Sequence, residues 1–136
     1  MKIELSGFET ADDVEDAFYA AFASCDIKAM QDVWADDEIV CIHPGSKAIF
    51  GYDNVIRSWR HIFHEAELPD IIFNIVNSIE SEVLAIHVVE EHIVTGNDSA
   101  VVILATNVYQ NFDNGWLMIE HHGSVIQTQV EGITLQ

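Results

Sequence analysis

Four long runs rich in Val, Ile and Thr fill the second half of the chain, and this feature constrains the fold most. These residues favour strands because branched side chains pack well on a pleated surface. The runs occupy residues 71–79, 82–94, 99–112 and 115–127. Asn114-Gly115, a strong hairpin signal, separates the last two runs. The pattern therefore predicts a long, twisted, mainly antiparallel sheet.

The first half of the chain has the periodicity of helices. Thr10 stands before ADDVEDAFYAAFASCD as an N-cap, followed by acidic residues in the first turn. Asp26 stands before a second short helix, IKAMQDVWA, and a third helix, NVIRSWRHIFHEA, starts at Asn54. Between them, EIVCIHPG is typical of a short strand that ends in a Pro-Gly turn. Three helices on one face of a sheet predict an α+β fold, and residues 1–136 suit a single domain.

The composition excludes several classes of partner. Lys and Arg total 5 against 23 Asp and Glu, a net charge of −18. Such a charge repels phosphate backbones and anionic lipid surfaces, so we expect no nucleic-acid or membrane partner. No run of eighteen apolar residues occurs, and the first residues do not resemble a signal peptide. We therefore expect a soluble, cytoplasmic protein in which Cys25 and Cys41 are free thiols.

Sequence motifs for cofactors are absent. The chain has no Gly-rich phosphate loop, no dinucleotide fingerprint and no Ser-His-Asp pattern, which predicts that it uses no cofactor. His61 and His64 are three residues apart on the third expected helix, a spacing that can chelate a metal. No third ligand is evident beside them, so we expect no metal site.

The Asn-Gly turn allows the pairing of the last two runs to be counted. If residues 114 and 115 form a two-residue turn, Tyr109 faces Glu120 and Asn107 faces His122. One face of the ribbon then carries Asn107, Tyr109, Trp116, Met118, Glu120, His122 and Ser124. His121 points to the opposite face, and a slip of one residue or a bulge would exchange the two histidines.

This face combines polar groups with two large apolar side chains, Trp116 and Met118. Apolar walls with a few convergent polar groups are typical of a ligand pocket. The same mixture also suits a hydrated dimer interface or an exposed strand end. On the neighbouring strand, Glu90 and His92 share one face, and His87 and Glu91 share the other. We interpret these residues as exposed to solvent or as part of an interface.

Four residues near the middle of the chain are further candidates. His43 follows a short strand and stands before Pro44, where a side chain either lines a cavity mouth or hydrogen-bonds within the turn. Trp59 on the third helix is either a pocket wall or a core aromatic. Arg57 and Arg60 flank it, and they either anchor an anionic ligand or pair with the many carboxylates.

Three segments of the chain resemble a known family. VWADDEIVCIHPG, IFGYDNVIRSWRHIF and ATNVYQNFDNGWLMIEHHGS look like the SnoaL-like branch of the nuclear transport factor 2-like superfamily, which also contains ketosteroid isomerase. The resemblance implies a strongly curved sheet wrapped around a helix, forming a cone with an internal apolar pocket. It also implies a homodimer through the sheet. Because this fold hosts isomerases, cyclases, dehydratases and binding modules, it does not imply one reaction.

One functional hypothesis is proton transfer on a small, largely apolar carbonyl compound. Glu120 and His122 would form the acid/base pair, while His43, Tyr109 or Asn107 donates a hydrogen bond to the enolate. The chemistry would be of the isomerase, cyclase or lyase type, without a metal or organic cofactor. The Tyr and Asp set of the steroid isomerase is not matched here, so the resemblance does not extend to steroid isomerisation.

The same hypothesis assigns Trp59, Trp116, Asn107 and Tyr109 to substrate binding. The alternative is a module that binds a ligand or dimerises without catalysis, because no nucleophile motif is present. Turnover with a bell-shaped pH profile would indicate the enzyme, and saturable binding without product would indicate the module.

Overall fold

The computed structural model describes residues 7–65, 67–96, 99–130 and 133–135. Helices dominate the first half of this part of the chain and strands the second, as the sequence predicts. In chain order the elements are α1 (Ala11–Ser24), α2 (Ile27–Val33), β1 (Val40–Ile42), β2 (Ile49–Phe50), α3 (Tyr52–Glu65), β3 (Asp70–Glu80), β4 (Leu84–Val94), β5 (Ala100–Phe112), β6 (Gly115–Val130) and β7 (Ile133–Leu135).

The first two helices begin at the predicted caps. The Thr10 side chain accepts a hydrogen bond from the Asp13 backbone N–H at 3.0 Å, and Asp26 accepts one from Ala29 at 3.1 Å. Each bond satisfies an N–H that has no partner inside its helix. Helix α1 ends at Cys25, which adopts the left-handed conformation with φ 52°. These local signals determine where α1 and α2 begin and where α1 ends.

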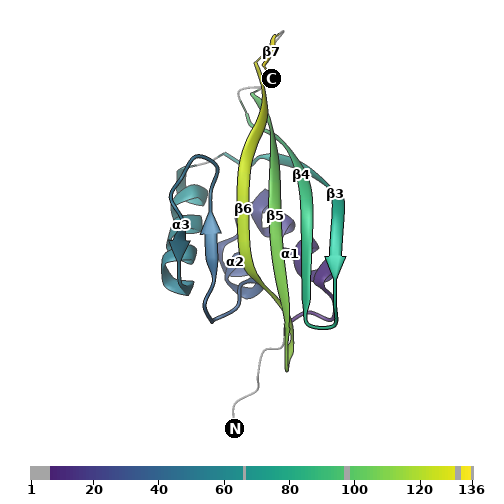
Figure 1. Cartoon of the computed structure of the whole chain (residues 1–136). Helices are drawn as coiled ribbons and strands as arrows, with labels where there is room; N and C mark the ends of the chain where they lie inside the picture. Colours follow the sequence, from purple (N-terminus) through teal and green to yellow (C-terminus); the bar gives the residue numbers. More distant parts are fainter. Residues whose placement is uncertain (1–6, 66, 97–98, 131–132, 136) are drawn as a thin grey trace.

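The described strands form one mixed, open sheet in the order β2-β1-β6-β5-β4-β3, with β7 paired to β6 (Figure 1). Strand β1 runs parallel to β6, and the other neighbours are antiparallel. The expected closure into a strongly curved cone is not confirmed, because the edge strands β2 and β3 do not pair. Strands β1 and β2 have only three and two residues, so they extend the sheet little beyond β6.

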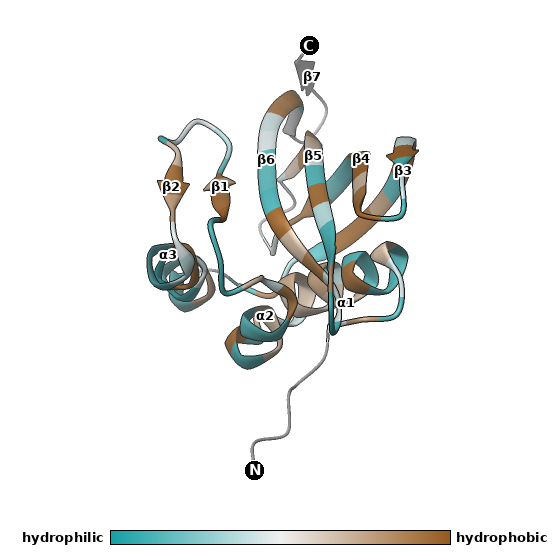
Figure 2. Cartoon of the chain, turned by 60° about the horizontal axis from the view of Figure 1, so that its bottom comes forward, coloured by the Kyte–Doolittle hydropathy of each residue, from teal (hydrophilic) through white to brown (hydrophobic). Residues whose placement is uncertain are grey.

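The helices lie on one side of the sheet, as predicted (Figure 2). Helices α1 and α2 lie under the long strands, and α3 lies beside β2. The core between the layers contains Phe18, Met30, Trp59 and Met118, each no more than 1% exposed. No helix of the described residues is long and apolar enough to cross a membrane.

The β5–β6 hairpin departs from the predicted register at its turn and at two bulges, Ile119 and Ile126. The turn occupies Asp113 and Asn114, one residue earlier than predicted, because Phe112 pairs with Gly115. A bulge at Ile119 then shifts the pairing again, so that Tyr109 lies opposite Met118 and Val108 opposite Glu120. The predicted pairs of Tyr109 with Glu120 and Asn107 with His122 are therefore wrong. Asn107 lies opposite His121.

Candidate functional site

Seven polar side chains lie between α1 and the sheet with no more than 3% of their surface exposed. We call them the inner polar cluster: Glu15, Tyr19, His87, Glu91, Asn107, Tyr109 and His121. Burying so many polar groups is costly unless they bond to one another. Each of the seven makes at least one hydrogen bond within the cluster.

Elementary periodicity brings the cluster together. Glu15 and Tyr19 are four residues apart and therefore occupy one face of α1. Strand β4 alternates buried and less buried residues, which turns His87 and Glu91 toward the helices, and β5 does the same for Asn107 and Tyr109. The bulge at Ile119 adds His121 from β6.

Glu15 is the hub of the cluster. Its Oε2 accepts a hydrogen bond from the Tyr109 hydroxyl at 2.6 Å and a longer one from the Asn107 amide at 3.4 Å. Its Oε1 lies 3.0 Å from Nδ1 of His87. Burial alone would lower the pKa of His87, but hydrogen bonds to Glu80 and Glu15 outweigh it, so this pKa is raised.

Tyr19 and Glu91 form a short pair at one side of the cluster. The Tyr19 hydroxyl donates to Oε2 of Glu91 at 2.5 Å and accepts from the Asn107 amide at 2.9 Å. Burial raises the pKa of Glu91 to about 7, although the bond from Tyr19 opposes the shift. Burial and the neighbouring Glu91 charge raise the pKa of Tyr19. The Glu91 carboxyl group therefore changes its charge near neutral pH while Tyr19 stays protonated.

His121 is held as a neutral imidazole. Its Nδ1 lies 2.6 Å from Oδ1 of Asn107, and an amide oxygen only accepts, so Nδ1 carries the proton. Burial lowers the pKa of His121 to about 3, with smaller contributions from His43 and His122. Its ring lies 6.0 Å from that of Trp59, centroid to centroid. His121 and Trp59 thus connect the inner polar cluster to the region around His43.

His43 is also neutral at physiological pH, because burial lowers its pKa. Its Nε2 lies 2.9 Å from Oγ of Ser58, and that hydroxyl donates its single proton to the Val55 carbonyl at 2.7 Å. His43 must therefore donate from Nε2, which leaves a lone pair on Nδ1. Burial raises the pKa of the neighbouring Cys41 thiol to about 12, so this group is not a thiolate.

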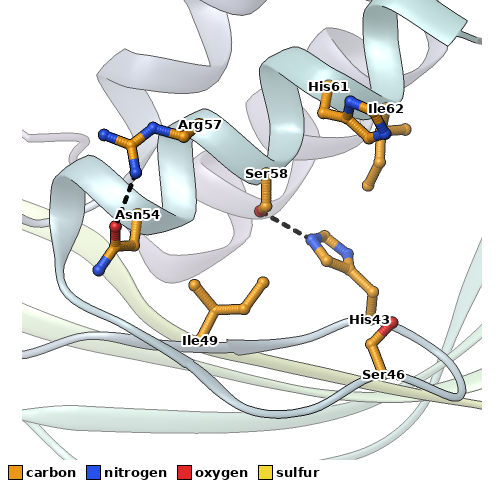
Figure 3. A pocket seen from close by; sticks show the side chains of 8 residues that line it. All are labelled: His43, Ser46, Ile49, Asn54, Arg57, Ser58, His61 and Ile62. Carbon is orange, nitrogen blue, oxygen red and sulfur yellow. Dashed lines mark hydrogen bonds between the residues drawn. The ribbon is translucent and has the colours of Figure 1, made fainter.

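His43 opens onto a surface hollow of about 490 Å³ between α3 and the β1–β2 loop (Figure 3). The hollow is lined by His43, Ser46, Ile49, Asn54, Arg57, Ser58, His61 and Ile62. Nη1 of Arg57 donates to Oδ1 of Asn54 at 3.1 Å. The described residues place no carboxylate within ion-pair distance of Arg57, although the chain is strongly acidic. The hollow therefore combines a neutral base, a cation and apolar walls.

The model of the SnoaL-like domain family matches residues 12–128. The chain belongs to the SnoaL-like family. A protein from Thiobacillus denitrificans, described as a calcium/calmodulin-dependent protein kinase type II association domain, is 36% identical to this SnoaL-like domain, with a TM-score of 0.85. The match covers 90% of this chain and 100% of that one.

Other comparisons with this SnoaL-like domain are more distant. A protein from Streptomyces avermitilis, described as a dehydratase of the nuclear transport factor 2-like family, is 24% identical over 85% of this chain and 92% of its own, with a TM-score of 0.78. A ketosteroid isomerase-like protein from Erwinia carotovora is 20% identical with the same coverage and a TM-score of 0.71. These two show the shared fold alone.

A curated relative of the SnoaL-like domain is the F-box protein SKIP8 of Arabidopsis thaliana. It is 26% identical over 114 residues, which make up 83% of this chain. The chain spans about half of that protein, 48% of its length. The comparison therefore concerns one part of a longer protein.

The structure of the SnoaL-like domain divides the predicted site residues into two groups. Asn107 and Tyr109 are fully buried and face the helices. Glu120 and His122 lie on the other face of the sheet, and His122 is exposed. The bulge at Ile119 causes this division, because it reverses which side chains of β6 face inward beyond that point. The predicted acid/base pair of Glu120 and His122 required both residues to share a face with Asn107 and Tyr109, and they do not.

The remaining predicted residues lie nearer the hollow or at the turn. His43 lines the hollow, while Trp59 is 1% exposed, lies behind His43 at 4.8 Å between ring centroids, and belongs to the core. Trp116 is partly buried against the core and lies next to the β5–β6 turn, away from the hollow residues.

Sequence reasoning missed five members of the inner polar cluster. Alternation places His87 and Glu91 on one face, but that face is buried rather than exposed. Glu15 and Tyr19 lie within the apolar stripe of α1, next to Val14 and Phe18. A polar residue at such a position is the sequence signal that could have indicated their burial. His121 could not be found without knowledge of the bulge.

Proposed function

We propose that this SnoaL-like domain binds a small, largely apolar carbonyl compound in the hollow and transfers protons on it. The observation that carries the proposal is the pairing of His43 with Ser58, which leaves Nδ1 of a neutral imidazole with a lone pair. A neutral imidazole is the side chain best suited to accept a proton near pH 7.

The hollow also contains a group that would stabilise the product of that step. Removing a proton beside a carbonyl group places negative charge on the carbonyl oxygen. Arg57 contributes a guanidinium to the hollow, and its bond to Asn54 fixes the direction of the cation. Ile49 and Ile62 offer apolar surface for the rest of the compound. Return of the proton at another carbon gives isomerisation, and loss of a β-substituent gives a lyase reaction.

Deuterium exchange tests this proposal whichever product the reaction forms. The full chain is incubated with a panel of small ketones in D₂O, and incorporation beside the carbonyl group is followed by NMR. We expect His43→Gln to lower the exchange rate at least about 100-fold, the usual contribution of a positioned base. His64→Gln, at an exposed position of α3 that does not line the hollow, serves as the matched control.

Two outcomes would contradict the proposal. Exchange at the buffer rate for every ketone would remove the catalytic assignment, and an equal rate in wild type and His43→Gln would remove His43 from it. Saturable binding without exchange would favour the alternative, a binding module without catalysis.

The open face of the sheet supports a second element of the proposal, a homodimer. Ile72 and Ile79 on β3 are 67% and 63% exposed, and Leu104 on β5 is 37% exposed. Apolar groups gathered on one face favour burial against another surface. Changing Ile79 to Lys should shift the mass measured by light scattering from dimer to monomer, whereas Leu68→Lys, outside the sheet, should not. An unchanged dimer in Ile79→Lys would exclude this face.

A further inference from the structure

The imidazole of His87 is surrounded by carboxylates. His87 is fully buried, and its Nδ1 lies 3.0 Å from Oε1 of Glu15. On the other side of the ring, Nε2 lies 2.9 Å from Oε2 of Glu80 and 3.8 Å from Oδ1 of Asp12. Asp12 is on the first turn of α1, and Glu80 ends β3. Two separate elements, α1 and β3, therefore each bring a carboxyl group to Nε2 of His87 on β4.

Three carboxyl groups around one imidazole ring favour a positive charge at Nε2. Glu15 accepts the proton on Nδ1, so Nε2 of a neutral imidazole presents a lone pair. The lone pair would face Glu80 and Asp12, whose ionised carboxylates also only accept. Either a second proton or a metal cation resolves the repulsion among these three atoms. Asp12 and Glu80 are exposed, with 69% and 50% of their side chains accessible, so the position is open to ions from solvent.

The geometry and the ligand types select a metal of one class. The three donor atoms lie within 4.8 Å of one another. Bonds of about 2.1 Å to a tetrahedral ion place its ligands about 3.4 Å apart, between the two distances from Nε2. One imidazole with two carboxylates suits Zn²⁺ and its neighbours, whereas Mg²⁺ and Ca²⁺ prefer oxygen ligands alone. A carboxylate on the second nitrogen, here Glu15, is the usual support of a histidine that binds a metal.

We propose that Asp12, Glu80 and His87 bind a divalent transition-metal ion of the Zn²⁺ class. Nε2 of His87 and one oxygen of each carboxylate are the protein ligands, and water completes the coordination from the solvent side. Glu15 is a positioning residue that fixes the tautomer of His87. The metal site shares no residue with the hollow, so a test of metal binding does not depend on the proton transfer proposed there.

Calorimetric titration of the metal-free full chain with Zn²⁺ tests the site. Excess Mg²⁺ in the buffer occupies the weak sites that so acidic a chain offers to any dication. We expect Asp12→Asn and Glu80→Gln each to lower the Zn²⁺ affinity at least about tenfold. The controls are Asp13→Asn and Glu82→Gln, exposed neighbours with the same change of charge, which should leave the affinity unchanged. All four substitutions are at exposed positions, so we expect each variant to fold.

A spectroscopic measurement identifies the histidine. In ¹⁵N-labelled protein, Zn²⁺ should move the Nε2 resonance of His87 to the position of a metal-bound nitrogen while Nδ1 keeps its proton. The proposal is overturned if Asp12→Asn and Glu80→Gln bind Zn²⁺ as their controls do. It is also overturned if both nitrogens of His87 remain protonated in excess Zn²⁺, since the group would then be a histidinium paired with carboxylates.

Discussion

The inner polar cluster and the hollow use the same kinds of side chain in opposite ways. In the cluster, Glu15 accepts from three partners and Asn107 bonds on both its oxygen and its nitrogen. In the hollow, His43 bonds to Ser58 and Arg57 donates to Asn54, and both side chains keep further hydrogen-bonding capacity. Saturated groups fix the shape of the protein, whereas unsaturated groups are available to a ligand. Apart from His87, whose Nε2 faces the proposed metal site, the cluster should therefore govern stability, and the hollow should govern binding of the carbonyl compound.

The largest effect on stability is expected from the hub of the cluster. Glu15→Ala leaves the Tyr109 hydroxyl and His87 without their buried acceptor, which should lower the free energy of unfolding by about 3–5 kcal/mol. Urea unfolding followed by tryptophan fluorescence measures the change. Asp16→Ala, one residue later on the exposed side of α1, should cost less than about 0.5 kcal/mol. Equal costs would show that the cluster does not stabilise the fold.

The next effect concerns pH and Glu91. Its pKa rises from 4.5 to about 7 on folding, so the folded state binds more protons between these values. The contribution of Glu91 to stability is complete below pH 4.5 and is lost as the pH rises through 7, a change of up to about 3 kcal/mol. Glu91→Gln should remove this decline.

Unfolding of the wild type and Glu91→Gln at a series of pH values isolates the contribution of Glu91. His121 has the opposite dependence, because its pKa falls from 6.5 to about 3 and its contribution is lost as the pH falls. Since both proteins contain His121, its effect cancels in the difference. Parallel curves between about pH 4.5 and 8 would be incompatible with a raised pKa at Glu91.

A smaller effect is expected at the base of the hollow. His43→Gln removes one partly buried hydrogen bond to Ser58, which should cost about 1 kcal/mol of unfolding free energy. The same variant should lose ketone exchange almost completely. A loss of stability as large as that of Glu15→Ala would place His43 with the structural cluster instead.

The smallest effect on stability is expected for Arg57→Gln. Arg57 is exposed and bonds only to Asn54 in the described part of the chain, so the unfolding free energy should change by less than about 0.5 kcal/mol. Exchange in the ketone panel should nevertheless fall about tenfold or more. Arg60→Gln, on the same helix but outside the hollow, should leave both quantities unchanged. Equal exchange rates in the two variants would exclude Arg57 from binding.

The sequence is sufficient for the order of elements but not for the register of the last hairpin. Caps such as Thr10 and Asp26, and the alternation along β4 and β5, are local signals that the tertiary structure preserves. The Asn114-Gly115 dipeptide predicts that a turn occurs here, but not which residues occupy it. Gly115 has φ 125° and lies against the backbone of Gly7, where an added Cβ would be 2.7 Å from its carbonyl carbon. The glycine thus serves a close backbone approach that only the folded chain reveals.

The candidate site is partly predictable for the same reason. The alternation of side chains along a strand is enough to place Asn107 and Tyr109 on one face, and both residues are buried on that face. The bulge at Ile119 has no sequence signature that a count of residues could detect. Glu15 resembles any acidic residue of an amphipathic helix until its partners on β4 and β5 are known.

The bulge at Ile119 decides which residue of β6 lies opposite Asn107. Ile119 is the extra residue between Met118 and Glu120, and beyond it His121 faces the helices. A strand that lacked Ile119 would keep the same partners on either side, so His121 would still lie opposite Asn107. A strand of the present length without the bulge would place Glu120 there instead. A relative with one residue fewer at this point should therefore keep the buried imidazole, whereas one that keeps the length but loses the bulge should bury a carboxyl group in its place.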